Sequence, residues 1–250
     1  MWRFLIAGHG FIFVNFNAGR PENSGILAKF AVVMSEKAIS NDRPQLPEPT
    51  LRRLPWYMAY VSTLRASEVE NVSTTRIAEA LNVDPSQIAK DLSFLGIRGK
   101  TRIGYQVAEL EETLANFLGF GRRHNAIMAG AGSLGAALIA DSGLQRYGLN
   151  IVAGIDVNPA IIGTKISGVE IFAPDALKEL VARFNASIGV IAVPFESAQA
   201  VSDSLAEAGI KGIWNFTPSR IRVPEGIVIA NTSIYSHLAV MYNRLSALGE

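Results

Sequence analysis

The 250-residue chain contains no cysteine, and this absence removes three classes of chemistry together. Without a thiol there can be no disulfide, no thiolate metal site and no cysteine nucleophile. The sequence also lacks an apolar run of about eighteen residues, the length that a membrane-spanning helix needs. The formal net charge is only +1, so any signal for nucleic-acid binding must be local. The lack of cysteine fits a reducing cytoplasm, where we expect this protein to act.

The composition is that of an ordinary globular protein, with 49% hydrophobic and 18% charged residues, and the length predicts one or two domains. Residues 1–45 fit poorly with the rest. Their apolar start has only Arg3 as a charged leader, and His9 and Asn15 interrupt it, so a signal peptide is weakly supported. We expect this extension to be disordered or non-native. From Met34 the chain reads as a normal polar N-terminus, and we expect translation to begin there.

Residues 46–121 carry the pattern of three helices. The first follows Pro49. The second, TTRIAEALN, has an N-cap within residues 72–75 and ends at Asn82, and the third begins with Asp84 as N-cap and Pro85 in its first turn. The positions predicted to face inward are Leu51, Leu54, Met58 and Val61, then Ile77, Ala80 and Leu81, and finally Ile88, Leu92 and Leu95. Two short helices joined by a tight turn after a longer helix indicate a helix-turn-helix.

The segment IRGKTRIGYQV, residues 97–107, predicts a β-hairpin with several basic residues and no acidic one. Each part alone is most often an ordinary structural element, but a basic hairpin directly after a recognition helix favours a winged-helix DNA-binding domain. Gln can read adenine and Lys can read guanine or phosphate. Asp91 lies about 100° around the helix from Lys90 and is interpreted as a structural or orienting residue rather than a base reader. The residues expected to contact DNA are Arg52, Arg53, Arg76, Ser86, Gln87, Lys90, Lys100 and Arg102.

A dinucleotide-binding fingerprint, G-x-G-x-x-G, follows the apolar strand predicted at residues 126–129. Gly130 permits a tight turn, Gly132 lets a pyrophosphate approach the backbone, and Gly135 lets helix and strand pack closely. The phosphates are expected to bind the amides at the start of the next helix, which we predict to run to about Tyr147. The loop residues assigned to the cofactor are Gly130, Ala131, Gly132, Ser133, Leu134 and Gly135.

A second strand, NIVAGID, ends in Asp156, twenty-one residues after Gly135. A carboxylate at this place binds ribose hydroxyls and repels a 2′-phosphate, so NADH and NAD⁺ are favoured over the phosphorylated cofactors. Strands and helices then alternate to about residue 231, which predicts a doubly wound parallel sheet of Rossmann type over residues 122–231. Ligands bind at the carboxyl ends of such strands, so Val193, Pro194 and Phe216 are expected at the cofactor. His124 at a strand entrance is interpreted as structural.

Residues 232–250 predict a terminal helix with an apolar stripe. Such a helix either covers its own core or packs on a partner subunit. The residues assigned to dimerisation are Tyr235, Leu238, Met241, Tyr242 and Leu245.

Over about residues 46–248 the sequence resembles the Rex redox-sensing transcriptional repressors, through VDPSQIAKDLSFLG, GKTRIGYQV, GAGSLGAAL, IDVNPAIIGTKISGV and AGIKGIWNFTP. The resemblance implies a homodimer with N-terminal winged helices, NAD(H)-binding domains and an exchanged last helix, which binds palindromic operators and is released by NADH. Two positions depart from the family pattern. Ala89 stands where Arg is expected, so the operator sequence is expected to differ, and Ser233 stands where Asp is common, which puts an interdomain salt bridge there in doubt.

Two other functions compete with this interpretation. A small NAD-dependent dehydrogenase needs a titratable group near the hydride site, but the chain has no Tyr-x-x-x-Lys pair, and its three histidines lie outside the predicted rim. A nucleotide-binding accessory module for coenzyme A is disfavoured by Asp156, because the ribose of coenzyme A carries a 3′-phosphate. We therefore expect a regulator rather than an enzyme, with no metal and no membrane partner.

Overall fold

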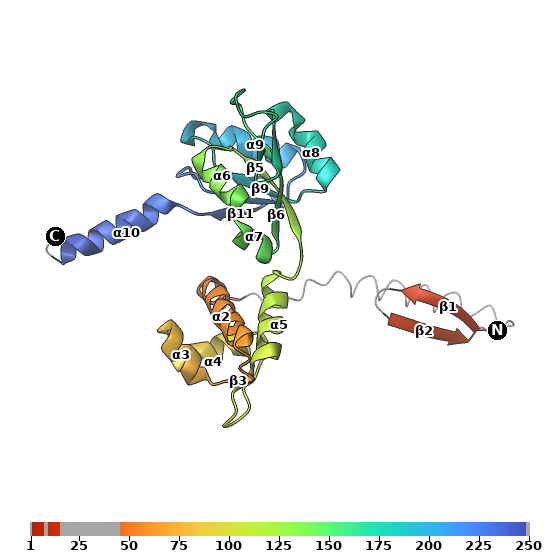
Figure 1. Cartoon of the computed structure of the whole chain (residues 1–250), viewed down its shortest axis with the longest axis vertical. Helices are drawn as coiled ribbons and strands as arrows, with labels where there is room; N and C mark the ends of the chain where they lie inside the picture. The colour runs from red at the N-terminus through yellow and green to blue at the C-terminus, as the bar shows by residue number, and fades with distance from the viewer. Residues whose placement is uncertain (1, 8–9, 16–45, 249–250) are drawn as a thin grey trace. The chain divides into compact units, whose positions relative to one another are not determined.

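The computed structural model describes residues 2–7, 10–15 and 46–248, and the chain divides into two compact units, Met1–Pro47 and Glu48–Glu250. In the first unit, β1 (Trp2–Ala7) pairs antiparallel with β2 (Gly10–Asn15) (Figure 1). Aromatic and β-branched residues in both strands favour this pairing. The expectation that residues 1–45 are disordered or non-native stays a prediction. The expected start at Met34 lies outside the described residues.

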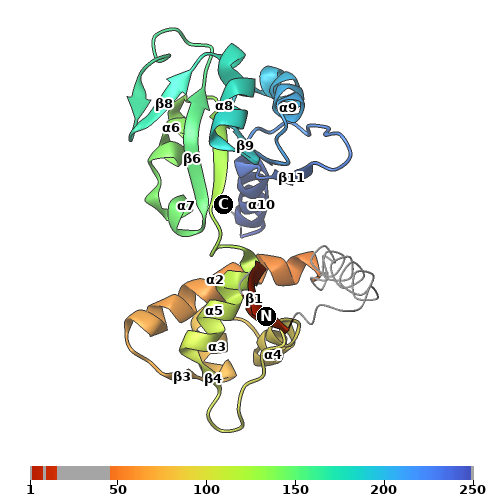
Figure 2. The same ribbon diagram turned by 90° about the vertical axis from the view of Figure 1, so that its right-hand side faces the viewer.

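The second unit begins with a helical region that forms a winged helix-turn-helix. Its elements are α2 (Glu48–Ala66), β3 (Asn71–Val72), α3 (Thr74–Leu81), α4 (Pro85–Ser93), β4 (Tyr105–Gln106) and α5 (Val107–Leu118) (Figure 2). The predicted caps are confirmed. Ser73 accepts a hydrogen bond from the Arg76 amide, Asp84 accepts one from Ser86, and Asn82 ends α3 in the left-handed conformation.

The buried face of α2 differs from the predicted stripe. It consists of Thr50, Leu54, Tyr57, Val61 and Leu64, so the stripe lies about one residue away from the predicted one at the start of the helix. Sequence reasoning missed Thr50 and Tyr57 because it followed apolar residues alone, and both of these bury a hydroxyl group that is hydrogen-bonded. Three other predicted core positions are also less buried than expected. Ala80 is exposed, whereas Leu81 and Leu95 are half-buried.

The predicted hairpin over residues 97–107 is shorter than expected. Its two sides meet only at a bridge between Lys100 and Gly104, whose backbones exchange two hydrogen bonds of 2.8 Å. Residues 101–103 form the turn, where Arg102 has a φ of 66°. The extended part that follows, β4, pairs instead with β3 in front of the helix-turn-helix. The wing is therefore a tight basic loop rather than a two-stranded ribbon.

The rest of the second unit is a Rossmann-type domain built on a seven-stranded sheet with the order β11-β10-β9-β5-β6-β8-β7. All neighbouring pairs are parallel except β7 with β8. The strands are β5 (His124–Ala129), β6 (Leu149–Ile155), β7 (Lys165–Ile166), β8 (Val169–Phe172), β9 (Ile188–Ile191), β10 (Gly212–Asn215) and β11 (Val228–Asn231). The predicted doubly wound sheet is confirmed, with one short antiparallel edge strand added.

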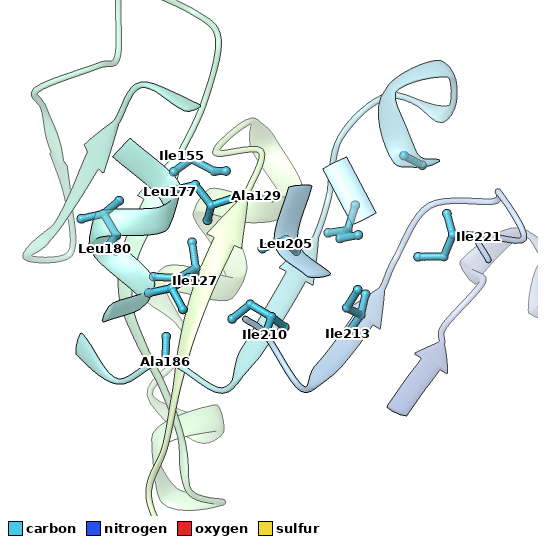
Figure 3. Close-up of a cluster of buried hydrophobic side chains, with 14 residues drawn as sticks. Ile127, Ala129, Ile155, Leu177, Leu180, Ala186, Leu205, Ile210, Ile213 and Ile221 are labelled. Carbon is cyan, nitrogen blue, oxygen red and sulfur yellow. The ribbon is translucent and has the colours of Figure 1, made fainter. Parts of the chain in front are cut away.

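Helices cover both faces of this sheet, and successive side chains of β5 contribute alternately to the two apolar clusters beneath them. Ala126 and Met128 lie in a cluster with Ile139 of α6 (Ser133–Ala140), whereas Ile127 and Ala129 lie in another. That second cluster also contains Leu180 of α8 (Leu177–Phe184) and Leu205 of α9 (Ala198–Glu207) (Figure 3). Successive side chains of a strand point to opposite faces, so one continuous apolar strand supports two cores.

The helix expected to continue to about Tyr147 is broken. Asp141 adopts an extended conformation and accepts a hydrogen bond from the Gly143 amide, which begins a separate short helix, α7 (Ser142–Arg146). A short polar side chain that bonds to nearby amides competes with a continuing helix, and this is the physical reason for the break.

The chain's last described helix, α10 (Ile234–Ala247), begins with Ser233 as N-cap and has no buried residue. This agrees with the predicted terminal helix but excludes the alternative that it covers its own core in the single chain. Among the described residues, no helix combines the length and apolar character needed to span a bilayer.

Candidate nucleotide site and nucleic-acid interface

The carboxyl ends of four parallel strands meet at one edge of the sheet. Ala129, the last residue of β5, pairs with Ile155 at the end of β6 and with Ile191 at the end of β9, and Ile191 pairs with Asn215 at the end of β10. The residues just beyond these ends are therefore neighbours along one edge. The chain continues from β5 to β6 on one side and returns to β9 on the other, so the β5–β9 junction is a topological switch point, where Rossmann-type domains bind ligands.

The glycine loop lies at this junction, and its three glycines differ in what requires them. Gly130 has a φ of 89°, and a Cβ there would lie 2.7 Å from the Ala192 carbonyl oxygen. A Cβ on Gly135 would lie 1.9 Å from the Gly130 carbonyl oxygen, so α6 and β5 pack backbone to backbone. A Cβ on Gly132 would meet no protein atom within 4 Å. The turn predicted at Gly130 and the close packing predicted at Gly135 are thus confirmed, whereas the protein itself does not require a glycine at 132.

Asp156 follows β6 and turns its carboxylate toward the glycine loop. Oδ2 accepts a hydrogen bond of 2.7 Å from the Ala131 amide, and Oδ1 accepts one of 2.9 Å from the Asn158 amide. The carboxylate is half-buried and fixed by these two amides. The structure therefore brings together the two parts of the predicted motif, the loop and the acidic residue, although they are twenty-five residues apart.

The rim predicted from the ends of β9 and β10 is built on a buried asparagine. The Asn215 side chain donates to the Ser219 carbonyl at 2.8 Å and to Asn231 Oδ1 at 2.9 Å, and its own Oδ1 accepts from the amide and hydroxyl of Thr217. Phe216 packs on Trp214, with ring centroids 4.5 Å apart. Val193 is half-buried and Pro194 exposed, so both are accessible at the same edge. Sequence reasoning missed the role of Asn215, for which only its place at a strand end gave a signal.

The predicted DNA-contacting residues divide by their exposure. Gln87 and Arg53 are half-buried, and the others are exposed, namely Arg52, Arg76, Ser86, Lys90, Lys100 and Arg102. Arg52 forms an exposed ion pair with Glu48 at 2.7 Å. Lys90 and Ser86 lie on the outer face of α4, opposite the buried Ile88 and Leu92.

Arg53 has a partner inside the domain that the sequence did not predict. Its Nε donates to Asp91 Oδ2 at 2.7 Å and its terminal nitrogen donates to Oδ1 at 2.9 Å. The Arg53 side chain keeps 21% of its surface exposed, while that of Asp91 is fully buried. The expected phosphate contact of Arg53 stays a prediction, but the interpretation of Asp91 as structural is confirmed.

Asp91 lies at the centre of a buried polar network between α2 and α4. In addition to Arg53, it accepts hydrogen bonds from Thr50 Oγ1 at 3.0 Å, Tyr57 Oη at 2.7 Å and Gln87 Nε2 at 2.8 Å. Burial alone would raise the pKa of Asp91, but the hydrogen bonds from Arg53, Tyr57, Gln87 and Thr50 outweigh it and lower this pKa below its ordinary value. Burial and the hydrogen bond to Asp91 raise the pKa of Tyr57. The network therefore contains a carboxylate that is ionised and a phenol that is neutral at physiological pH.

The three residues predicted at the rim, Val193, Pro194 and Phe216, have side chains that cannot act as a general acid or base. Among residues 2–7, 10–15 and 46–248, no group of three His, Asp or Glu side chains is placed to hold a metal ion. His124, interpreted as structural, lies at the start of β5, where its amide donates to the Gly148 carbonyl at 2.8 Å.

Two family models match the two functional regions of the chain. Residues 45–93 match a model described as "Putative DNA-binding protein N-terminus", and residues 122–219 match one described as "CoA binding domain". The redox-sensing transcriptional repressor Rex of Porphyromonas gingivalis is 52% identical over 216 residues, which cover 85% of this chain and 99% of that protein.

Solved structures of a Rex-family repressor, RSP, also match over both regions. The complex of RSP with β-NAD⁺ and operator DNA is 33% identical, covers 82% of this chain and 94% of that one, and has a TM-score of 0.78. The complex of RSP with β-NADH is 32% identical, covers 83% and 97%, and has a TM-score of 0.73.

The chain belongs to the Rex family of redox-sensing transcriptional repressors. The resemblance inferred from the sequence motifs is therefore confirmed, as is the combination of a winged helix with a Rossmann-type domain. Membership of this family also confirms the expectation that the chain is a regulator and not an enzyme, although its nucleotide-binding fold is of the dehydrogenase type.

Proposed function

We propose that this protein is a homodimeric repressor that binds palindromic operator DNA and is released when NADH binds, so that operator occupancy reports the NADH/NAD⁺ ratio. The observation that carries the proposal is the presence, in one chain, of a helix-turn-helix with an exposed basic wing and a glycine loop whose Ala131 amide donates to the carboxylate of Asp156. A structural relative covering both regions was solved with NAD⁺ and operator DNA, and also with NADH. Because repression acts on DNA, the protein is proposed to work in the cytoplasm.

The residues of the nucleotide site fit NADH and NAD⁺. Gly132 leaves the loop backbone open to a pyrophosphate, because even a Cβ there would touch no protein atom. The amides of residues 132–135 belong to the loop and the start of α6, where a helix favours phosphate, whereas the Ala131 amide donates to Asp156. The carboxylate of Asp156 suits the hydroxyls of an unmodified ribose and disfavours a 2′-phosphate.

The nicotinamide is proposed to lie at the rim formed by Val193, Pro194 and Phe216. Oxidised nicotinamide carries a positive charge that the reduced ring lacks. An apolar rim removes water from that charge without replacing its hydration, so it should favour the reduced ring. In this way the rim supplies the redox discrimination that the repressor needs.

The helix α10 is proposed to form the subunit interface. Its apolar residues Tyr235, Met241, Tyr242 and Leu245 are exposed and Leu238 is half-buried, although they recur on the helix as a buried stripe would. A second copy of the chain is the expected partner for this surface. Sedimentation should show a dimer for the protein and a monomer for Tyr242→Glu, whereas a monomeric parent protein would contradict the interface.

The decisive experiment measures NADH affinity with and without operator DNA, with NAD⁺ and coenzyme A as controls. If NADH lowers DNA affinity, the operator must lower NADH affinity by the same factor, typically about 5–150-fold. Equal NADH affinity in the two conditions would exclude the sensor function, even if DNA and NADH each bind tightly. Binding of coenzyme A in place of NADH would favour the accessory-module alternative.

A further inference from the structure

Gln87, a predicted base-reading residue on α4, has a side-chain amide that is hydrogen-bonded to a buried residue of the domain. Its Nε2 donates to Asp91 Oδ1 at 2.8 Å, one helical turn further along the same helix. Gln87 is half-buried, whereas its neighbours Ser86 and Lys90 are exposed. The nitrogen of its amide is therefore held by the network, while the side chain keeps part of its surface accessible.

The carboxylate of Asp91 determines which way this amide faces. An ionised carboxylate only accepts hydrogen bonds, so the nitrogen of the amide, and not its oxygen, must point toward it. Asp91 itself cannot turn to follow another partner, because Thr50, Arg53 and Tyr57 of α2 all donate to its two oxygens. Helix α2 thereby fixes the orientation of a side chain on the recognition helix α4.

We propose that Asp91 is a positioning residue for operator recognition, which fixes the Gln87 amide with its oxygen as an acceptor and its second N–H as a donor for one base. This inference rests on the proposed DNA-binding function. An acceptor beside a donor is the pattern that matches adenine, which offers an N6 donor and an N7 acceptor in the major groove. An amide that rotated freely would also present the reversed pattern and would discriminate less between bases.

The test compares binding to the operator and to operators substituted at each half-site position. Asp91→Asn removes the acceptor-only group, and Gln87→Ala removes the amide. Each variant should lose about 10-fold discrimination at the same half-site position. The double variant should lose no more than Gln87→Ala alone, because Asp91 acts through Gln87. The salt dependence of Gln87→Ala should stay unchanged, since this variant removes no phosphate contact.

A control variant separates this role from a general weakening of α4. Asp84→Ala removes the N-cap carboxylate of α4 and destabilises the helix, but it leaves the side-chain hydrogen bond between Gln87 and Asp91 in place, so it should keep the base preference. Equal loss of affinity for all sequences in Asp91→Asn, or a further loss of discrimination when it is added to Gln87→Ala, would overturn the proposal. Failure of the unmodified protein to bind any operator would instead overturn the proposed function.

A measurement on the unmodified protein covers the case in which Asp91→Asn does not fold. The side-chain amide signals of Gln87 can be identified in an NMR spectrum by their absence in Gln87→Ala. They should show a restrained amide that is protected from solvent exchange. Signals with the mobility and exchange of a free surface glutamine would overturn the inference.

Discussion

Two glycines of the nucleotide loop should respond differently to the same substitution, one in stability and the other in cofactor affinity. In Gly135→Ala the new Cβ begins 1.9 Å from the Gly130 carbonyl oxygen, and a normal contact requires at least 3.0 Å. The start of α6 must therefore move away from β5, which as overpacking costs about 1–3 kcal/mol. The better helix propensity of alanine returns about 1 kcal/mol at most. We expect a net loss of about 1–2 kcal/mol in the free energy of unfolding.

Gly132→Ala should leave that stability nearly unchanged, because its φ of −66° suits any residue and its Cβ meets no protein atom. Its effect should appear in cofactor binding, where the methyl group occupies the approach of the pyrophosphate. We expect NADH affinity to fall about 10-fold or more, which corresponds to about 1.4 kcal/mol.

Urea unfolding without cofactor and fluorescence titration with NADH measure the two effects separately. The reasoning predicts that Gly135→Ala shifts the unfolding midpoint and that Gly132→Ala shifts only the titration. If Gly132→Ala bound NADH as tightly as the parent protein, the pyrophosphate would not approach the backbone at this residue. If Gly135→Ala were as stable as the parent, the close packing of α6 on β5 would not constrain the loop.

Further variants and a measurement of pH dependence probe other parts of the molecule. Asp156→Ala should lower the affinity for NADH and make NADPH relatively better tolerated. Because the amides of Ala131 and Asn158 also lose their acceptor in this variant, Asp156→Asn is the milder comparison. An unchanged NADH titration would remove this residue from the site. Lys90→Ala should weaken operator binding by about 1–3 kcal/mol and alter the base preference. Arg102→Ala should weaken binding to all DNA sequences alike and lower the dependence of affinity on salt. Gel shifts at several salt concentrations measure both effects, and two variants that bind operator like the parent protein would contradict the assigned contact surface. The pKa of Asp91 is lower in the folded protein than in the unfolded chain. The ionised carboxylate therefore contributes its full stabilisation of the fold above the unfolded-state pKa, and this contribution is lost as pH falls through the folded-state pKa. Acid unfolding that is equally steep in Asp91→Asn would argue against this.

The local features of the fold could be predicted because short-range chemistry determines them. The caps Ser73 and Asp84 bond to amides two or three residues away, and the spacing from Gly135 to Asp156 reflects one strand–helix–strand unit. Each of these signals lies within one short stretch of the sequence. The pattern of strands and helices in the Rossmann-type domain was predictable for the same reason.

The Asp91 network could not be predicted in the same way. Asp91 bonds to Thr50 and Tyr57, which lie 41 and 34 residues away, and no periodicity connects them. The break at Asp141 was missed because the side chain of one short polar residue decides it. The antiparallel strand β7 is only two residues long, too short to leave a pattern of its own.

The end of β10 is hydrogen-bonded both to the rim and to the residues that lead into α10. The amide of Thr232 donates to the Asn215 carbonyl at 2.8 Å, and Trp214 Nε1 donates to the Thr232 hydroxyl at 2.9 Å, only two residues before α10 begins. A fourteen-residue helix is about 21 Å long. A rotation of about 5° at its base would therefore carry its far end about 2 Å, given a rise of about 1.5 Å per residue. Angular amplification of this kind would let a small adjustment beside Phe216 reach the far end of α10, the helix proposed to form the subunit interface, as a displacement large enough to change side-chain packing.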